Sequence, residues 1–371
     1  MNSRAPRQDE GPALIDLLDM FPTEESAVAY LVRERWPDGI YCTKCGSVDV
    51  GMSKARDGLF FCRGCNGRFS VTTGTVMEAT KLPLRTWLLA THLMAGGKKS
   101  VSAKYLERSL KISYRTAWHL GHRIRMAMRS RDDSPLVGTI ETDEKYHGGK
   151  AKNRGQGYRG NKAAEQGIVQ RAKQGKPGRA VSVVLAPDDH VDGRTVGANL
   201  RKHTDPSASR LMTDESQIYS KVGEVFVSHE TVHHKKQEYS RVDPKSGRLI
   251  TTNTVEGMFA NQERQINGTH HGVSKKHLQK YLDEHDFKYN SPEISDGARM
   301  LLAVRGGEGR RLTLFETRGG SHEALIKHPV DAVLGDTVDD GEDFRQGRVP
   351  RLRPGRKPVR RAISRRRRTR R

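Results

Sequence analysis

The sequence predicts a multidomain protein with four consecutive parts: an N-terminal zinc ribbon, a helical segment of helix-turn-helix-like shape, an α/β domain and a basic, disordered tail. Three observations predict this organisation. All four cysteines fall in two Cys-x-x-Cys pairs, apolar residues recur at helical spacing over residues 84–130, and strand-like and helix-like segments alternate over residues 136–292. A chain of 371 residues is long enough for about two or three domains.

The helices of the first half are expected to begin at side chains that cap helix N-termini. They are predicted at residues 23–36 (capped by Thr23), 84–95, 102–110 (capped by Ser102) and 113–129 (capped by Ser113). In the last of them Ala117, Gly121, Ile124 and Met128 fall on one face. Two helices joined by a tight turn at residues 111–112 have the shape of a helix-turn-helix.

The period changes after Leu136. Strands are predicted at residues 137–142, 180–185, 209–213 and 224–228, and helices at 195–203, 216–222, 254–265 and 274–289. The Gly- and Lys-rich stretch 148–179 is expected to hold loops and at most one strand. The remainder, 293–371, has weak periodicity and ends in an arginine-rich tail.

The net charge of +22 is concentrated in two segments. Residues 85–131 carry eleven basic side chains against one acid, and residues 345–371 carry fourteen against none. Such clustering favours a polyanionic partner, most simply nucleic acid, although a solubilising tail fits the second segment too. No apolar run approaches the roughly 18 residues of a membrane span, and acids in the first twenty residues break a signal-peptide pattern. We therefore expect a soluble cytoplasmic protein with no membrane partner.

The cysteine spacing is typical of a structural zinc site. Cys42 and Cys45 form one pair, Cys62 and Cys65 the other, and sixteen residues separate them. Two such turns supply four thiolates tetrahedrally, and Gly46 and Gly64 are expected to give these turns their backbone freedom. A redox role is the alternative, but it does not usually come as a pair at this spacing. The ribbon's own role, in binding DNA or protein or in bracing a neighbour, stays open.

The basic helical segment is the predicted DNA reader. The N-terminal end of a recognition helix reaches base edges, so Arg115 is expected to read a base, with Lys104 and Arg123 on phosphates. A helical hairpin that braces the zinc ribbon, with a solvated basic face, is the alternative.

Three acids stand out by their position in the α/β domain. Asp143 lies at the end of one predicted strand, Asp214 just past another, and Glu256 in the first turn of a predicted helix. Converging carboxylates repel one another unless cations lie between them, and their hard oxygens suit Mg²⁺ or Mn²⁺. Two such ions promote phosphoryl transfer. Each acid also has a plain reading as a turn or cap residue, and the neighbours Glu141, Glu144 and Glu215 keep the choice open.

Two further patterns are interpreted without a metal or cofactor. The histidine pairs 233–234 and 270–271 are expected to contact phosphate or core, because they lack the spacing of metal ligands. Gly155, Gly157 and Gly160 match the letters of a dinucleotide fingerprint but lack its strand and helix, and are expected to be loop glycines.

At this point the sequence resembles a known family, the zinc-ribbon DDE transposases of bacterial insertion sequences of the ISXO type. The resemblance covers residues 15–292 and rests on residues 35–39 (RWPDG), 73–75 (TGT), 81–87 (KLPLRTW), 117–118 (AW), 122–125 (HRIR), 141–144 (ETDE), 213–215 (TDE), 253–257 (NTVEG), 273–278 (VSKKHL), 281–284 (YLDE) and 289–290 (YN). It implies an RNase H-like catalytic fold, with Asp143, Asp214 and Glu256 as the metal-binding catalytic triad. Asn253 is a rival for the third position. The family commonly places a cation on the same helix; position 263 is Glu here, which leaves Arg264 as the best candidate.

The resemblance implies a DNA transposase that binds the ends of an insertion sequence, cleaves them with two Mg²⁺ or Mn²⁺ ions and joins them to target DNA. Since two ends must be brought together, at least a dimer on DNA is expected. A DNA-bound protein of this kind is also expected to associate with the nucleoid. Two alternatives remain: an inactive DNA-binding regulator derived from a transposase, and an RNase H-like nuclease without strand transfer. The expected domains are 16–72 (helix and ribbon), 73–132 (helical DNA-binding segment), 136–292 (catalytic domain) and 293–371 (extension and tail).

Overall fold

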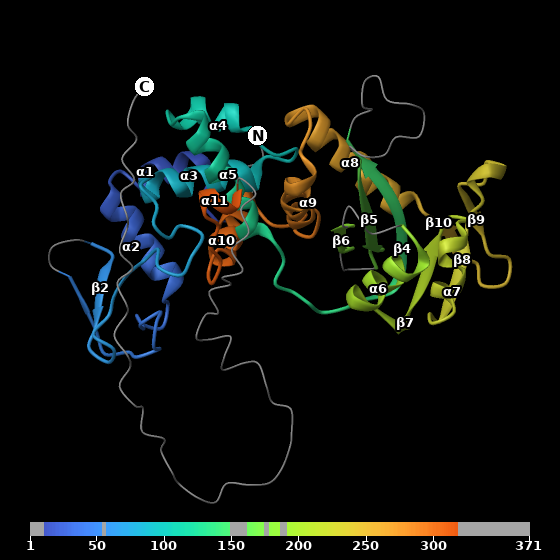
Figure 1. Cartoon of the computed structure of the whole chain (residues 1–371), viewed down its shortest axis with the longest axis horizontal. Coiled ribbons are helices and arrows are strands. Elements are labelled where there is room, and N and C mark those ends of the chain that lie inside the picture. The colour runs from blue at the N-terminus through green and yellow to red at the C-terminus, as the bar shows by residue number, and fades with distance from the viewer. Residues whose placement is uncertain (1–10, 54–56, 149–161, 174–177, 186–190, 318–371) are drawn as a thin grey trace, which may run out of the picture. The chain divides into compact units, whose positions relative to one another are not determined.

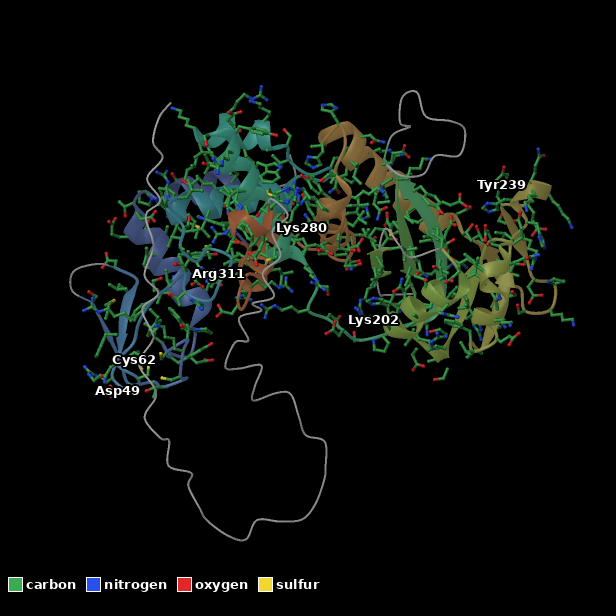
Figure 2. The ribbon with its side chains drawn as sticks, viewed as in Figure 1. Asp49, Cys62, Lys202, Tyr239, Lys280 and Arg311 are labelled. Atoms are coloured by element: carbon green, nitrogen blue, oxygen red, sulfur yellow. The ribbon has the colours of Figure 1, made fainter. Side chains whose placement is uncertain are left out.

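The computed structural model describes residues 11–53, 57–148, 162–173, 178–185 and 191–317. The glycines at 155–160 and the arginine tail lie outside these residues. The first elements are α1 (Leu14–Met20), α2 (Glu24–Arg35), β1 (Val50–Met52), β2 (Leu59–Cys62), β3 (Arg68–Ser70), α3 (Leu84–Gly96), α4 (Ala103–Leu110) and α5 (Tyr114–Met128). Strands β1, β2 and β3 form an antiparallel sheet in that order, marked by Asp49 and Cys62 in Figure 2.

The predicted caps of this half are confirmed. The side chains of Thr23, Ser102 and Ser113 each accept a hydrogen bond from the backbone N–H three residues later, at the N-termini of α2, α4 and α5. Trp36 is the C-terminal cap of α2, as the sequence predicts. Short polar side chains fix these starts locally, because each satisfies an N–H that the first helical turn leaves without a partner.

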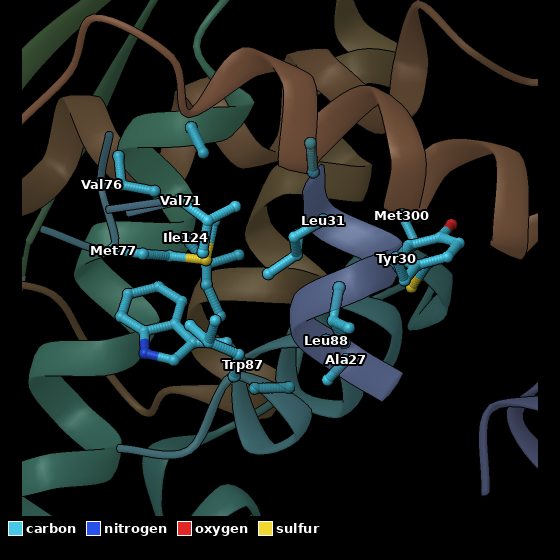
Figure 3. Packing of buried hydrophobic residues seen from close by; sticks show 14 of the residues in the cluster. Ala27, Tyr30, Leu31, Val71, Val76, Met77, Trp87, Leu88, Ile124 and Met300 are labelled. Carbon is cyan, nitrogen blue, oxygen red and sulfur yellow. The ribbon is translucent and has the colours of Figure 1, made fainter. Parts of the chain in front are cut away.

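One hydrophobic core joins the ribbon to the helices. Trp36 packs edge-on against Phe60 and Phe69 of the small sheet, with ring centroids 5.4 and 6.0 Å apart. Figure 3 shows the continuation of the same core, where Trp87 of α3 and Ile124 of α5 lie among side chains from α2 and from the segment after the ribbon. The ribbon and the helical segment therefore share buried apolar surface.

The chain returns to this core after the α/β domain. Helix α10 (Asp296–Gly306) packs against α3 and α5 and contributes the buried Met300, and the short α11 (Leu314–Thr317) follows. Residues 74–76 hydrogen-bond to residues 307–309, and the guanidinium of Arg310 donates to the carbonyls of residues 126, 127, 129 and 130 at the end of α5. The weak periodicity after residue 293 gave no indication of this packing.

The α/β domain is built on a five-stranded sheet of order β6-β5-β4-β7-β8. Its elements are β4 (Leu136–His147), β5 (Ala163–Gln170), β6 (Ala180–Val184), α6 (Gly193–His203), β7 (Thr204–Thr213), the 3₁₀ turn η1 (Gln217–Tyr219), α7 (Ser220–Gly223), β8 (Ser228–Thr231), the 3₁₀ turn η2 (His234–Lys236), β9 (Ser240–Val242), β10 (Leu249–Thr251), α8 (Asn253–Thr269) and α9 (Lys275–Tyr289). Strands β4, β5 and β6 are antiparallel, whereas β7 and β8 run parallel to β4.

Two strand predictions were wrong. The strand predicted at residues 224–228 lies instead at Ser228–Thr231, because Phe226 enters the core from a turn while its neighbours Val225 and Val227 are exposed. The first strand does not end at Asp143 but continues to His147, since β5 pairs with it along this whole stretch. Asp143 nevertheless lies at a structural boundary, because the pairing of β4 with β7 ends two residues earlier, at Glu141.

Helices cover the two faces of this sheet differently. Leu200 of α6 and Tyr219 of η1 pack in one buried cluster with Ile140 and Leu211 of the sheet, whereas Met258 and Phe259 of α8 pack in another with Val169 of β5. At Gly167 of β5 a side chain would meet Met258 at 2.7 Å, so glycine permits the close approach of α8. None of the helices in the described part of the chain is long and apolar enough to cross a membrane.

Candidate functional site

The four cysteines lie together at one end of the small sheet. Their sulfur atoms are all within 4.8 Å of one another, with 3.8 Å between Cys42 and Cys65 and 3.6 Å between Cys45 and Cys62. Tetrahedral Zn²⁺ with Zn–S bonds of about 2.3 Å places sulfur atoms about 3.8 Å apart. The predicted donor set therefore fits a structural zinc ion, and no disulfide joins these residues.

The turns that hold the cysteines use their glycines differently from the prediction. Gly46 has a φ of +75° and donates its N–H to the carbonyl of Cys42, as a left-handed turn residue does. In the second turn the left-handed residue is Asn66, with a φ of +53°. Gly64 is required instead for close approach, because a side chain there would lie 2.9 Å from Ser47.

In the α/β domain, side chains on one face of β4 bind helix α8 at two points. Glu141, Asp143 and Lys145 are every second residue of the strand, so their side chains lie on the same face. Glu141 accepts hydrogen bonds from the first turn of α8, and Lys145 donates to the carbonyl of Phe259 and to Glu263 further along that helix. Asp143 lies between these two anchor points.

The predicted acids share one electrostatic environment. Burial, together with the negative charges of Asp214 and Glu256, raises the pKa of Asp143 to about 6. The hydrogen bond from the N–H of Glu144 and the charge of His234 oppose this rise. Asp214 directly follows β7 and accepts from the N–H of Ser216 at 2.9 Å. The sheet and α8 thus bring the three carboxylates into mutual repulsion. They are more widely spaced than the cysteines, which are the one described group with all ligand atoms within 4.8 Å.

Each of the neighbouring acids is engaged elsewhere. Glu141 is fully buried and binds Thr254, Val255 and the guanidinium of Arg171. Glu144 points to the other face of β4, where it accepts from the phenol of Tyr219, and burial raises its pKa to about 7. Glu215 accepts from the N–H groups of His234 and Lys235. These bonds give Glu141 and Glu215 partners of their own, whereas the charges of Asp143 and Asp214 also act on Glu144 and help to raise its pKa.

Sequence reasoning missed His234 as a member of this site. Its Nε2 lies 3.5 Å from the carboxylate of Glu256 and 3.3 Å from the hydroxyl of Thr252, which itself donates to Glu256 at 2.9 Å. His234 is recognised as part of the site only from its position in the fold, because residue 234 follows β8 whereas Glu256 belongs to α8. Asn253, the rival to Glu256, is exposed at the first position of α8. Arg264 is exposed and donates to Asn261, so its role as helper cation stays a prediction.

The predicted DNA-contacting residues of the helical segment divide into two kinds. Arg115 is exposed in the first turn of α5, and the side chain of Lys104 is 69% exposed, 4.9 Å from the ring of Tyr114. Arg123 is 7% exposed; its guanidinium lies over Trp87 and donates to the carbonyl of Glu78 at 2.6 Å. The prediction that Arg123 contacts phosphate was therefore wrong, because helical position alone does not reveal that this face of α5 turns into the core.

Comparison with known proteins matches two parts of the chain to protein families. The ISXO2-like transposase domain matches residues 135–290, and the transposase zinc-ribbon domain matches residues 22–68. A protein of Halobacterium salinarum described as an uncharacterized protein in transposable element ISH50 is 27% identical over 276 residues, which cover 71% of this chain and 89% of that protein. Both domains are present in the expected order, so the chain carries a transposase zinc ribbon followed by an ISXO2-like transposase domain.

Proposed function

We propose that this transposase is an active enzyme that binds the ends of an insertion sequence, cleaves the DNA there and transfers the strand to a target. The observation that carries the proposal is the electrostatic coupling of Asp143 with Asp214 and Glu256 at the edge where β4 and β7 part. Such an arrangement is unfavourable for the protein alone, and it is the donor set that a hard divalent cation prefers.

The three carboxylates are the proposed ligands of two Mg²⁺ or Mn²⁺ ions. Bound at this site, the ions would neutralise charge on the attacking and leaving oxygens of a phosphodiester. A carboxylate is a stronger ligand for these ions than the amide of Asn253, which favours Glu256 as the third acid. Asp143 and Asp214 come from neighbouring parallel strands, so a rigid sheet fixes their separation.

Several neighbouring side chains act in this proposal as positioning residues. Glu141 holds the first turn of α8, and Arg171 ties Glu141 to the carbonyls of Leu249 and Thr251 in the strand before that helix. Thr252 and His234 restrain the carboxylate of Glu256. The elements that carry Asp143 and Glu256 are therefore joined to one another by hydrogen bonds and an ion pair.

The sheet also supports the assignment of an RNase H-like fold. Three antiparallel strands in chain order, followed by two strands parallel to the first, give the order β6-β5-β4-β7-β8. In this arrangement the carboxyl side of β7 and the middle of β4 meet, which is where the proposed acids lie. Residues 136–292 are the proposed catalytic domain.

DNA recognition is assigned to the preceding parts of the chain. We infer that 16–72 and 73–132 bind the ends of the element, with α4 and α5 as a helix-turn-helix-like pair whose Arg115 reads a base and whose Lys104 contacts phosphate. The fourteen basic residues of 345–371 are proposed to clamp DNA without sequence preference, as part of the 293–371 extension. Joining two ends requires at least two copies of the protein on DNA in the nucleoid.

The proposal is tested by cleavage of a plasmid that carries a minimal element with the sequences flanking this gene. Purified protein with Mg²⁺ is compared with Asp143→Asn, and with Glu224→Gln as a control that removes an exposed carboxylate from the same domain. Cuts at the flanking repeats that disappear only in Asp143→Asn are expected. Binding to the repeats without cutting in Mg²⁺ or Mn²⁺ would instead identify the inactive regulator.

A further inference from the structure

Three cavities of the described chain adjoin one loop that the proposed chemistry does not use. A cavity of about 350 Å³ is lined by Trp118 of α5 and by residues 272–274, 276, 277 and 281 at the start of α9. It shares Trp118, Gly272 and Tyr281 with a cavity of about 330 Å³ that reaches Lys104 and Tyr114. It shares residues 272–274 with a third, of about 680 Å³, that reaches Lys145.

The cavity of about 350 Å³ is lined by a buried histidine with a ring nitrogen that has no partner among the described residues. His277 is 7% exposed and lines the cavity, and its Nδ1 makes no hydrogen bond to any described residue. The ring of His277 packs against Trp118 and His122, with centroids 5.4 and 4.5 Å away. Burial, together with the charges of Lys280 and Lys276, lowers the pKa of His277 to about 4, so the ring is neutral at pH 7 and either nitrogen can carry its proton. With the proton on Nδ1, this unpartnered nitrogen can donate to an acceptor from outside the chain.

The same cavity receives the N-terminus of a long helix. Helix α9 has fifteen residues, and its N-cap, Ser274, makes no side-chain hydrogen bond to the first turn. Ser274, the exposed Lys276 and His277 all line the cavity, and Lys280, labelled in Figure 2, lies one turn further along α9. The positive end of a helix together with a lysine is a favourable place for an anion.

The anion must come with an apolar or aromatic part. Trp118 is partly exposed at the cavity, whereas the other two tryptophans, Trp36 and Trp87, are 4% and 2% exposed. An indole beside a phosphate-binding site is a combination that binds single-stranded nucleic acid: positive charge holds the backbone, and a base packs on the ring. The adjoining cavities lead from Lys104 and Tyr114 on one side to Lys145, two residues beyond Asp143, on the other.

We propose that the start of α9 is a phosphodiester seat for a DNA strand, with the phosphate held by Lys276, the Nδ1 of His277 and the helix N-terminus, and the adjoining nucleotide against Trp118. The seat lies between the segment proposed to read the element's end and the proposed catalytic carboxylates. It would hold the strand in place between recognition and chemistry. The inference rests on the proposed function only for the choice of DNA as the ligand.

The experiment measures the fluorescence of Trp118 while the full-length protein is titrated, without Mg²⁺, with a short single-stranded thymidine oligonucleotide. Saturable quenching that disappears in Trp118→Phe is expected, since phenylalanine keeps an aromatic ring against His277. Inorganic phosphate alone should leave the emission unchanged because it brings no base. Absence of oligonucleotide quenching in the wild-type protein, or equal quenching by phosphate, would overturn the seat.

The charge contribution is tested with two matched lysine variants, by the anisotropy of a labelled oligonucleotide. Lys276→Gln should weaken its binding about tenfold and lower the log–log salt slope by about one. Lys221→Gln, which removes an exposed charge on α7 outside all three cavities, should change the affinity by about twofold or less. Equal losses in the two variants would refute the seat.

The end-cleavage assay, run on the same preparations, separates this inference from the proposed function. Mg²⁺-dependent cleavage by the wild-type protein without a specific effect of Lys276→Gln would refute the seat and keep the transposase activity. Quenching and a specific Lys276 effect in a protein that never cleaves would keep the seat and refute the activity.

Discussion

The carboxylate of Glu141 accepts hydrogen bonds from both the backbone N–H and the hydroxyl of Thr254, at 2.7 and 2.6 Å. This contact joins the middle of β4 to the first turn of α8. Glu141 lies two residues before Asp143, and Thr254 lies two residues before Glu256, so one buried carboxylate sets the relative position of two proposed metal ligands. An acid beside the proposed catalytic residues thus has a structural task, which its type and spacing alone would not distinguish from a catalytic one.

The substitution Glu141→Gln tests this task. Because Glu141 is fully buried and also pairs with Arg171, its loss should lower the free energy of unfolding by about 3 kcal/mol. Cleavage should slow while affinity for the element's ends is unchanged. Glu263→Gln, which removes a carboxylate that is 57% exposed, should cost less than about 1 kcal/mol. Denaturant unfolding measures both variants, and equal stability of the two would contradict the positioning role.

The raised pKa of Asp143 predicts a pH-dependent instability. Unfolded aspartate releases its proton near pH 3.9, whereas burial and the neighbouring acids raise the pKa of Asp143 to about 6 in the fold. Between about pH 4 and 6 the folded protein therefore holds the extra proton, and its stability falls as pH rises.

In Mg²⁺-free buffer at pH 7.5, Asp143→Asn should be more stable than the wild-type protein by on the order of 2 kcal/mol. The difference should shrink toward pH 4, and Mg²⁺ should reduce it by stabilising only the wild-type protein. Thermal unfolding followed across this pH range measures the effect. A variant no more stable than wild type at pH 7.5 would show that the three acids do not strain the fold.

Removing zinc should unfold the ribbon and disturb the core that it shares with the helices. Cys62→Ser takes away one of four thiolates, so bound zinc should fall from about one ion per chain toward none. Trp36, packed on Phe60 and Phe69, should become exposed and its emission should shift to longer wavelength. Arg68→Ala, an exposed change in β3 of the same sheet, is the control. Full zinc content in Cys62→Ser would contradict the four-thiolate site.

Arg115 and Arg123 of α5 should behave in opposite ways. Arg123→Ala removes a buried guanidinium that lies over Trp87 and binds the Glu78 carbonyl, and should destabilise the fold by about 2 kcal/mol or more. Arg115→Ala should leave stability within about 0.5 kcal/mol but weaken end binding and relax sequence preference. Binding to end and scrambled duplexes, beside unfolding of each variant, separates the two. A specific DNA-binding defect in Arg123→Ala with normal stability would contradict its structural role.

Local chemistry was predicted well from the sequence, and long-range packing was not. Thr23, Ser102 and Ser113 cap their helices as expected, because capping depends on residues within one turn. The four cysteines meet as their spacing predicts. By contrast, the position of β8 was predicted wrongly, and the sequence did not indicate that Arg123 is buried. Both features depend on which face a distant element covers.

Prediction of the candidate active site was limited in the same way. The sequence pointed to Asp143, Asp214 and Glu256 but left Glu141, Glu144 and Glu215 as rivals, and only their bonding partners tell them apart. His234 comes near Glu256 through the fold of the segment between β8 and β10, which no local pattern encodes.

Strand transfer from a pre-cleaved end tests the central claim most directly. A duplex with the element's terminal 3′-hydroxyl already free is incubated with a target plasmid, Mg²⁺ and wild-type protein or the variants Asp143→Asn, Asp214→Asn, Glu256→Gln and Asn253→Ala. We expect joined products with wild type and Asn253→Ala, and none with the three carboxylate variants, although all five proteins bind the end. Joining by Asp214→Asn or Glu256→Gln, or its loss in Asn253→Ala alone, would contradict the proposed triad.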